Sequence, residues 1–171
     1  MKMKMKMKKG LYPKRYIPKS LSLSDKKLQK KQLNKSRTHY KNNNYHTRKK
    51  VKSFKSKPSN HIQNAKDIYN IDKVNPSVAL ARKTGCSIKV LTKIMKKGQG
   101  AYYSSGSRPN QTAHSWGKAR LASAITGGKA AALEYSLLKS GCKPSSKALR
   151  FALKAKKTHK TGTRRVPKII V

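Results

Sequence analysis

Apolar residues recur at helical spacing along the second half of the chain and predict a series of short amphipathic helices. A helix over residues 76–84 is followed by a turn at Gly85, a helix cap at Ser87 and a second helix over 88–97 that Gly98 ends. The two helices resemble a helix-turn-helix pair, and an αα-hairpin with a solvated lysine face is the alternative. The polar face of the second helix carries the candidate nucleic-acid-binding residues Lys89, Thr92, Lys93, Lys96 and Lys97.

The stretch from residue 98 to 128 is the only long part of the chain that lysine does not dominate. Its first part, residues 98–111, is crowded with Gly, Ser, Pro and Asn, and this composition predicts an irregular loop. An Ala-rich segment over 112–126 predicts a central helix that begins at a Thr112 cap and ends at a pair of glycines.

Arg120 lies inside the apolar arc of that central helix, one turn after Trp116, where its guanidinium can stack on the indole ring. A buried arginine needs a partner. Arg120 therefore either pairs with Glu134 or with carbonyls at a helix end, or it points at a bound anion.

Further helices are predicted over residues 60–71, 129–138 and 147–157. Together these elements predict a mainly α-helical fold with one small domain over residues 61–157. Residues 158–171 form a basic tail with an apolar tip that can add a strand to a neighbouring sheet edge.

Residues 1–60 predict a long basic arm that is extended or disordered. Pro13 and Pro18 exclude a helix near its start, and a short helix over 25–34 has too few apolar residues to be buried alone. Three aromatic residues interleaved with the lysines either stack on unpaired bases or anchor the arm on a partner protein: Tyr40, Tyr45 and Phe54.

The net charge of the chain indicates what kind of partner it binds. The 171 residues contain 44 Lys and Arg against 4 Asp and Glu, which gives a net charge of +40. Such a surface repels itself and calls for polyanions: DNA, RNA, anionic lipid headgroups or an acidic protein surface. Because Lys strongly outnumbers Arg, contact with phosphates is favoured over bidentate reading of bases.

The remaining chemistry argues against an enzyme. The four acids are scattered, the five histidines lack metal-ligand spacing, and the serines near His114 have no acid to orient it. We therefore expect no catalytic residue, metal or cofactor. The two isolated cysteines, Cys86 and Cys142, predict neither a disulfide framework nor a zinc site and favour a reducing compartment. No apolar run is long enough to span a membrane.

The run Y-Y-S-S-G-S-R-P-N-Q followed by S-W-G-K-A-R-L-A-S-A-I-T-G-G resembles an uncharacterised family of basic proteins of nucleocytoplasmic large DNA viruses. Related forms of the motif occur in tailed phages. The similarity covers about residues 74–134, and more loosely residues 16–57. The resemblance implies a viral source and a structural role in the particle, but no activity.

Within the motif, the loop that leads into the central helix can bind an anion through backbone N–H groups, hydroxyls and arginines. A purely structural loop, with its tyrosines in the core, is the alternative. The candidate anion-binding residues are Ser104, Ser105, Ser107, Arg108 and Arg120.

The leading interpretation is a non-enzymatic viral structural protein, a minor capsid or core component of the virion made in the host cytoplasm or acting in the nucleus. Its polybasic arm would bind viral DNA, another polyanion or acidic capsid-protein surfaces within a large assembly. The alternative is a helix-turn-helix DNA-binding protein with an architectural or regulatory role, and a ribosome-like RNA binder is a third.

Overall fold

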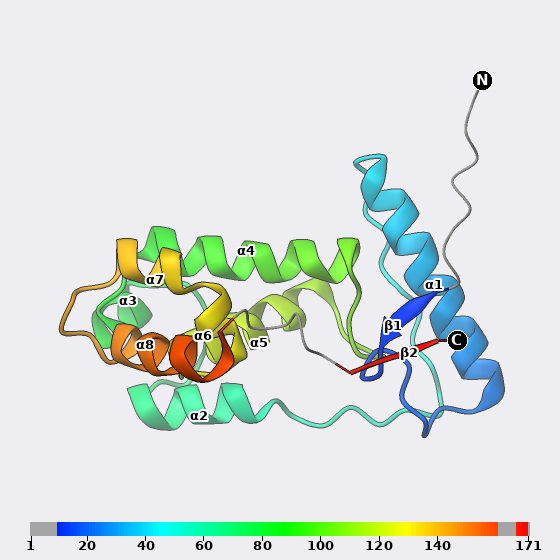
Figure 1. Ribbon diagram of the computed structural model, residues 1–171, viewed down its shortest axis with the longest axis horizontal. Coiled ribbons are helices and arrows are strands. Elements are labelled where there is room, and N and C mark those ends of the chain that lie inside the picture. Colours follow the sequence, from blue (N-terminus) through cyan, green and yellow to red (C-terminus); the bar gives the residue numbers. More distant parts are fainter. Residues whose placement is uncertain (1–9, 161–166, 171) are drawn as a thin grey trace.

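The computed structural model describes residues 10–160 and 167–170, and helices account for most of them, which confirms the mainly α fold (Figure 1). The described elements follow one another in the order β1 (Leu11–Pro13), α1 (Leu23–Lys41), α2 (Asn60–Tyr69), α3 (Val78–Thr84), α4 (Ile88–Ser104), α5 (Ala113–Ile125), α6 (Lys129–Leu133), α7 (Tyr135–Gly141), α8 (Lys147–His159) and β2 (Lys168–Ile170).

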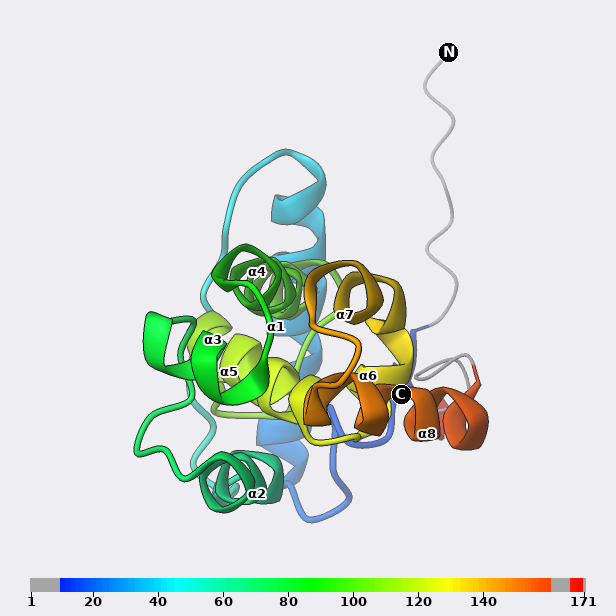
Figure 2. The same cartoon turned by 90° about the vertical axis from the view of Figure 1, so that its left-hand side faces the viewer.

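Helix α5 lies at the centre of the main helical body and contacts α2, α4, α6 and α8 (Figure 2). Its predicted start is confirmed, because the Thr112 hydroxyl accepts from the backbone N–H of Ser115 and the Ser115 hydroxyl accepts from that of Thr112. The residues that it buries, from Leu121 to Ile125, belong to a core that draws apolar side chains from Ala65 through Ala155.

Helix α4 does not end at Gly98 as predicted but continues to Ser104, so the loop expected over 98–111 begins only at Ser105. Gly98 is a packing position. A Cβ atom there would lie 2.8 Å from the Cα atom of Gly117 on α5, closer than carbon atoms approach. The glycine therefore lets two helix backbones cross closely and says nothing about where the helix stops.

The other helices fit their sequence signals with two local differences. The turn at Gly85 and the cap at Ser87 are confirmed, whereas α3 begins after Ser77 rather than at residue 76. The single helix predicted over 129–138 is split into α6 and α7 at Glu134, whose side chain is fully buried.

The N-terminal part contradicts the prediction of an extended or disordered arm over its described residues. Helix α1 is 19 residues long and packs against α4 (Figure 1). A second apolar cluster lies beside it. Residues 1–9, where the alternation of Met and Lys predicts a disordered tail, lie outside the described residues. The second cluster consists of Tyr12, Tyr16, Ile17, Leu21, Leu33 and Val51, with Leu28, Phe54, Trp116 and Ile169 packed against it.

Polar side chains fix α1 in place. The helix buries Gln29, Gln32 and Ser36, and each makes a hydrogen bond: the Gln29 amide donates to the Tyr16 carbonyl, for example, over 3.1 Å. Asn110 fixes the segment that follows α1, since its side-chain amide pairs with both the N–H and the carbonyl of Val51. The short helix predicted over 25–34 lies inside α1, but the pattern of apolar residues could not reveal its full length or its burial, because polar side chains supply much of the contact.

The apolar tip of the chain forms a strand, but it pairs inside the molecule rather than with a neighbour. Strand β2 is antiparallel to β1, with Leu11 opposite Ile170 and Pro13 opposite Lys168. The first and last described elements therefore lie side by side next to α1 (Figure 1).

A disulfide joins Cys86 to Cys142, so the prediction that these cysteines make no disulfide is wrong. The bond links the turn before α4 to the end of α7, and two backbone hydrogen bonds flank it. Ser87 donates to the Gly141 carbonyl and Lys143 to the Gly85 carbonyl, each over 2.8 Å. The two cysteines are 56 residues apart, and only the folded chain brings them together.

We expect Gly98→Ala to lower the free energy of unfolding by about 1–3 kcal/mol, because the new methyl group would press on the backbone of α5. Gly100→Ala is the matched control in the same helix. Its methyl group would meet only the Tyr40 hydroxyl, 3.7 Å away, so it should raise stability by about 0.5–1 kcal/mol. Urea unfolding measures both, and equal effects would contradict the close crossing.

We also expect the double substitution Cys86→Ser and Cys142→Ser to cost about 4 kcal/mol, the loop-closure entropy that a cross-link over this separation removes from the unfolded chain. Reductant should destabilise the native protein and leave the double variant unaffected. Detection of two free thiols in the native, unreduced protein would contradict the disulfide.

Candidate nucleic-acid interface

Helix α4 presents its basic residues to solvent along its whole first half. Its apolar side is buried against the core through Val90, Leu91, Ile94 and Met95. The opposite side therefore faces outward, as the helical spacing predicts. Of the five predicted binding residues, Lys89, Lys93, Lys96 and Lys97 are exposed, and Thr92 is half-buried between the two sides.

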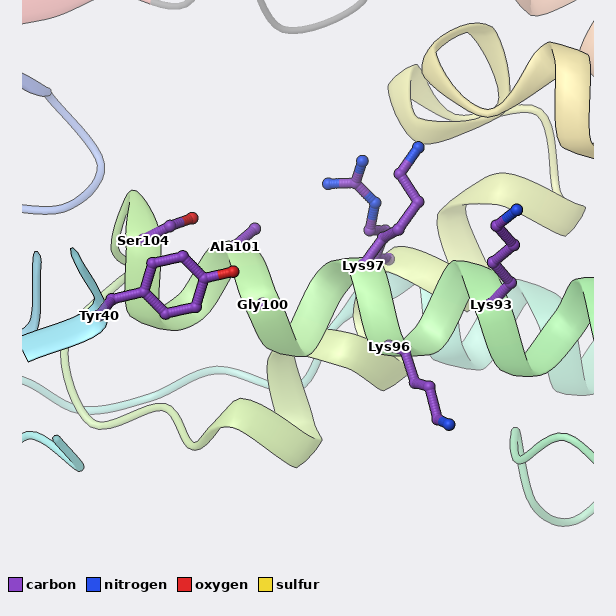
Figure 3. Close-up of a pocket in the computed structure, with 8 residues that line it drawn as sticks. Tyr40, Lys93, Lys96, Lys97, Gly100, Ala101 and Ser104 are labelled. Atoms are coloured by element: carbon purple, nitrogen blue, oxygen red, sulfur yellow. The ribbon is translucent and has the colours of Figure 1, made fainter. Parts of the chain in front are cut away.

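An open pocket of about 440 Å³ lies over the second half of this basic side (Figure 3). Tyr40 of α1 lies across α4 beside Gly100, and Arg120 reaches the pocket from α5. The pocket brings together residues from both predicted sets, the lysines of α4 and two of the anion-binding candidates. Its lining consists of Tyr40, Lys93, Lys96, Lys97, Gly100, Ala101, Ser104 and Arg120.

A buried carboxylate lies behind the pocket. Glu134 is fully buried, and its Oε2 atom accepts a hydrogen bond from the Lys97 ammonium over 2.6 Å. Its Oε1 atom accepts from Arg120 through both Nε, at 2.9 Å, and Nη2. Two cations thus share one carboxylate, and this group of three keeps a net charge of +1.

The pairing of Arg120 with Glu134 is therefore confirmed, but the predicted stack of Arg120 on Trp116 is wrong. The cation over the Trp116 ring is Arg15, 5.9 Å from its centroid. Trp116 itself packs edge-on against Tyr16 and joins the second apolar cluster. The helical spacing of residues could not distinguish a cation on the same helix, Arg120, from a cation of the N-terminal part, Arg15.

The structure separates the other anion-binding candidates. Ser104 lies at the pocket, whereas the Ser105 carbonyl is held by Arg37 through two hydrogen bonds of 2.7 and 3.0 Å. Ser107 is fully buried, accepts from Arg48 and donates to the Arg108 carbonyl. These contacts match the structural alternative for the loop, because its polar groups already have partners.

Arg108 is exposed and does not reach the pocket lining. Arg108 and Arg120 therefore do not converge on one anion as the sequence suggested. The Arg108 charge instead lies near His61, and burial together with this charge holds the pKa of His61 below its usual range.

A family model described as a family of unknown function, DUF5824, matches residues 13–141. The chain belongs to DUF5824. The matched span includes most of both apolar clusters, the central α4–α5 pair and the pocket, and it ends before α8. Searches of curated proteins and of solved structures found no match.

Neither a membrane-spanning helix nor a cluster of metal ligands is found in the described part of this DUF5824 protein. Within residues 10–160 and 167–170, no helix combines the length and the apolar character needed to cross a bilayer. The same residues contain no group of three or more His, Cys, Asp or Glu side chains arranged to hold a metal ion.

Arg48 is a buried cation that sequence reasoning missed. Its guanidinium donates to the Ser36 hydroxyl, to the Ser107 hydroxyl and to the Tyr102 carbonyl, over 3.0, 2.7 and 2.7 Å. It also lies 3.7 Å from the centroid of the Tyr102 ring. Burial lowers the pKa of this guanidinium. In the sequence Arg48 stands in a run of basic residues, and nothing marks it as different.

Four tyrosines form a chain of ring contacts beside the pocket. Tyr102 is fully buried and touches Tyr103, whose ring centroid is 5.0 Å from that of Tyr45; Tyr45 in turn lies 6.1 Å from Tyr40. Tyr103 is half-buried, whereas Tyr45 is 69% exposed and Tyr40 37% exposed. The interleaving of tyrosine with charge was visible in the sequence, but the meeting of α1 with the end of α4 was not.

We expect Arg120→Ala to lower the free energy of unfolding by about 3–5 kcal/mol, because it removes the main partner of a buried carboxylate. Glu134→Gln should cost a comparable amount, and the two losses should not add in the double variant. Lys97→Ala is the control: its side chain is 46% exposed, so its loss should be clearly smaller. An unchanged melting temperature for Arg120→Ala would contradict the structural role.

Proposed function

We propose that this DUF5824 protein is a non-enzymatic nucleic-acid-binding protein that holds phosphate groups on the exposed lysine side of α4. The observation that carries the proposal is the one-sided distribution of charge on this helix. Its lysines face solvent, while the carboxylate nearest to them, Glu134, is buried and already shared by two cations. Lys93 and Lys96 are therefore left to meet an external polyanion.

The biological setting that we propose is the particle of a DNA virus, where the protein would be a minor capsid or core component. This part rests on the resemblance of the central motif to basic proteins of large DNA viruses. Acidic surfaces of capsid proteins are a second class of partner for the same lysines, since a carboxylate-rich surface offers similar charge. A large assembly would also screen the self-repulsion of a chain with net charge +40.

The second candidate is a helix-turn-helix DNA-binding protein of architectural or regulatory function. In its favour, α3 and α4 are joined by the three-residue turn from Gly85 to Ser87, and α4 carries the lysines in the position of a recognition helix. The two candidates differ in sequence preference. If the protein is a structural phosphate binder, a selection from random DNA duplexes should return no preferred site. If it is a helix-turn-helix protein, the selection should return a defined site, and the double substitution Lys89→Ala and Thr92→Ala should abolish that preference.

We expect duplex DNA to bind strongly and in a salt-sensitive manner. The double substitution Lys93→Ala and Lys96→Ala should weaken binding across all sequences and reduce the slope of log K against log salt by about two. The matched control removes two exposed lysines of α8, Lys154 and Lys157, and should leave the slope nearly unchanged. Binding isotherms at salt concentrations of about 50 to 200 mM measure the affinity and the salt slope of each double variant.

Equal losses in the two double variants would mean that total charge, and not the α4 side, governs binding. A nearly flat salt dependence of the native protein would point instead to a protein surface as its partner.

A further inference from the structure

Two tyrosines beside the end of α4, Tyr40 and Tyr45, are exposed in a way that folding does not require. Tyr102 anchors the series in the interior, where its hydroxyl accepts a hydrogen bond of 3.1 Å from the Arg48 backbone. Tyr45, two contacts further out, is 69% exposed. A large ring left mostly in water contributes little burial to stability, so its presence on the surface needs another reason.

The exposed rings stand on a rigid support. Tyr40 belongs to the last turn of α1, and Tyr45 follows the short turn that ends this helix. Helix α1 is tied to the end of α4 by Ser36, which donates to the Tyr103 carbonyl, and by Arg37, which donates to the Ser105 carbonyl. The rings are therefore held in position before any ligand arrives, which lowers the entropy cost of binding.

Cations and one of the exposed rings share a pocket on α4. Tyr40 and the lysines of α4 line one pocket (Figure 3). Tyr40 meets α4 at Gly100, and Lys96 and Lys93 lie about one and two helical turns before that residue. At about 1.5 Å per residue, the seven residues from Lys93 to Gly100 span about 10 Å, the length of a short run of nucleotides. A strand whose phosphates follow the lysines would bring its bases to the tyrosines.

We propose that Tyr40, Tyr45 and Tyr103 form a stacking platform for unpaired bases, so that the site prefers single-stranded nucleic acid to duplex. This inference rests on the proposed function, because the lysines of α4 supply the phosphate contacts. In a duplex the faces of the bases are covered by their neighbours, whereas a single strand, a loop or a frayed end can place a base on a tyrosine ring. The platform tolerates any base, since every base has a π-face.

The test measures the affinities of the full-length protein for a labelled oligothymidine and for a duplex of the same length at one salt concentration. Stacking of one base on an aromatic ring corresponds to a change of about 5- to 150-fold in affinity. We therefore expect Tyr45→Ala to weaken single-strand binding by at least about fivefold and to leave duplex binding unchanged. Tyr45→Phe, which keeps the ring, should bind both as the native protein does.

An oligonucleotide that lacks its bases gives a second measurement that needs no variant. It carries the same phosphates but can stack on none of the three rings, so it should bind the native protein at least as weakly as the oligothymidine binds Tyr45→Ala. Leu153→Ala, which removes an exposed apolar side chain from α8, controls for a general loss of surface hydrophobicity. It should change neither affinity.

The outcomes separate this inference from the proposed function. If Lys93→Ala with Lys96→Ala weakens both ligands while Tyr45→Ala and the loss of the bases weaken neither, the platform is wrong and the phosphate site stands. If the native protein binds neither ligand, the proposed function fails and the inference fails with it. If Tyr45→Phe is as weak as Tyr45→Ala, the hydroxyl and not the ring makes the contact, and stacking is overturned.

Discussion

The buried carboxylate of Glu134 is the interaction on which the helical body depends. With only 4 acids against 44 basic residues, the chain has few means of neutralising a cation inside its core, and it places one of them between α4 and α5. Glu134 also lies at the break between α6 and α7, so one side chain fixes three parts of the fold. The close crossing at Gly98 and Gly117 then brings Lys97 and Arg120 to the same carboxylate.

Two other cations, Arg48 and Arg37, are stabilised by contacts with neutral groups. Arg48 is held by hydroxyls, a carbonyl and a tyrosine face, and Arg37 by a carbonyl and the ring of Tyr12, 4.7 Å from its guanidinium carbon. Neutral acceptors and rings leave the positive charge in place. The net charge of the surface is therefore almost undiminished by folding, which is the condition that the proposed phosphate contacts require.

The sequence predicted those parts of the fold in which local chemistry decides the structure. Thr112 and Ser87 begin helices as expected, and the alternation of apolar and basic positions places the lysines of α4 outside. It failed where a long-range contact overrides the local signal: Gly98 is a crossing point, and buried glutamines help to fix α1 beside its few apolar contacts, Leu28 and Leu33. The candidate site divides in the same way, since its lysines were predicted, whereas the tyrosine series and Arg48 depend on how α1 meets α4.

The pairing of β1 with β2 has a consequence for how the molecule is made. Strand β1 precedes every described helix in the chain, and its partner, residues Lys168–Ile170, follows all of them. During synthesis the hydrogen bonds between the two strands, and the one from Lys14 to the Pro167 carbonyl, can therefore form only after α8 has been made. The N-terminal cluster, to which both Tyr12 and Ile169 belong, is thus closed by a segment that is made after the whole helical body.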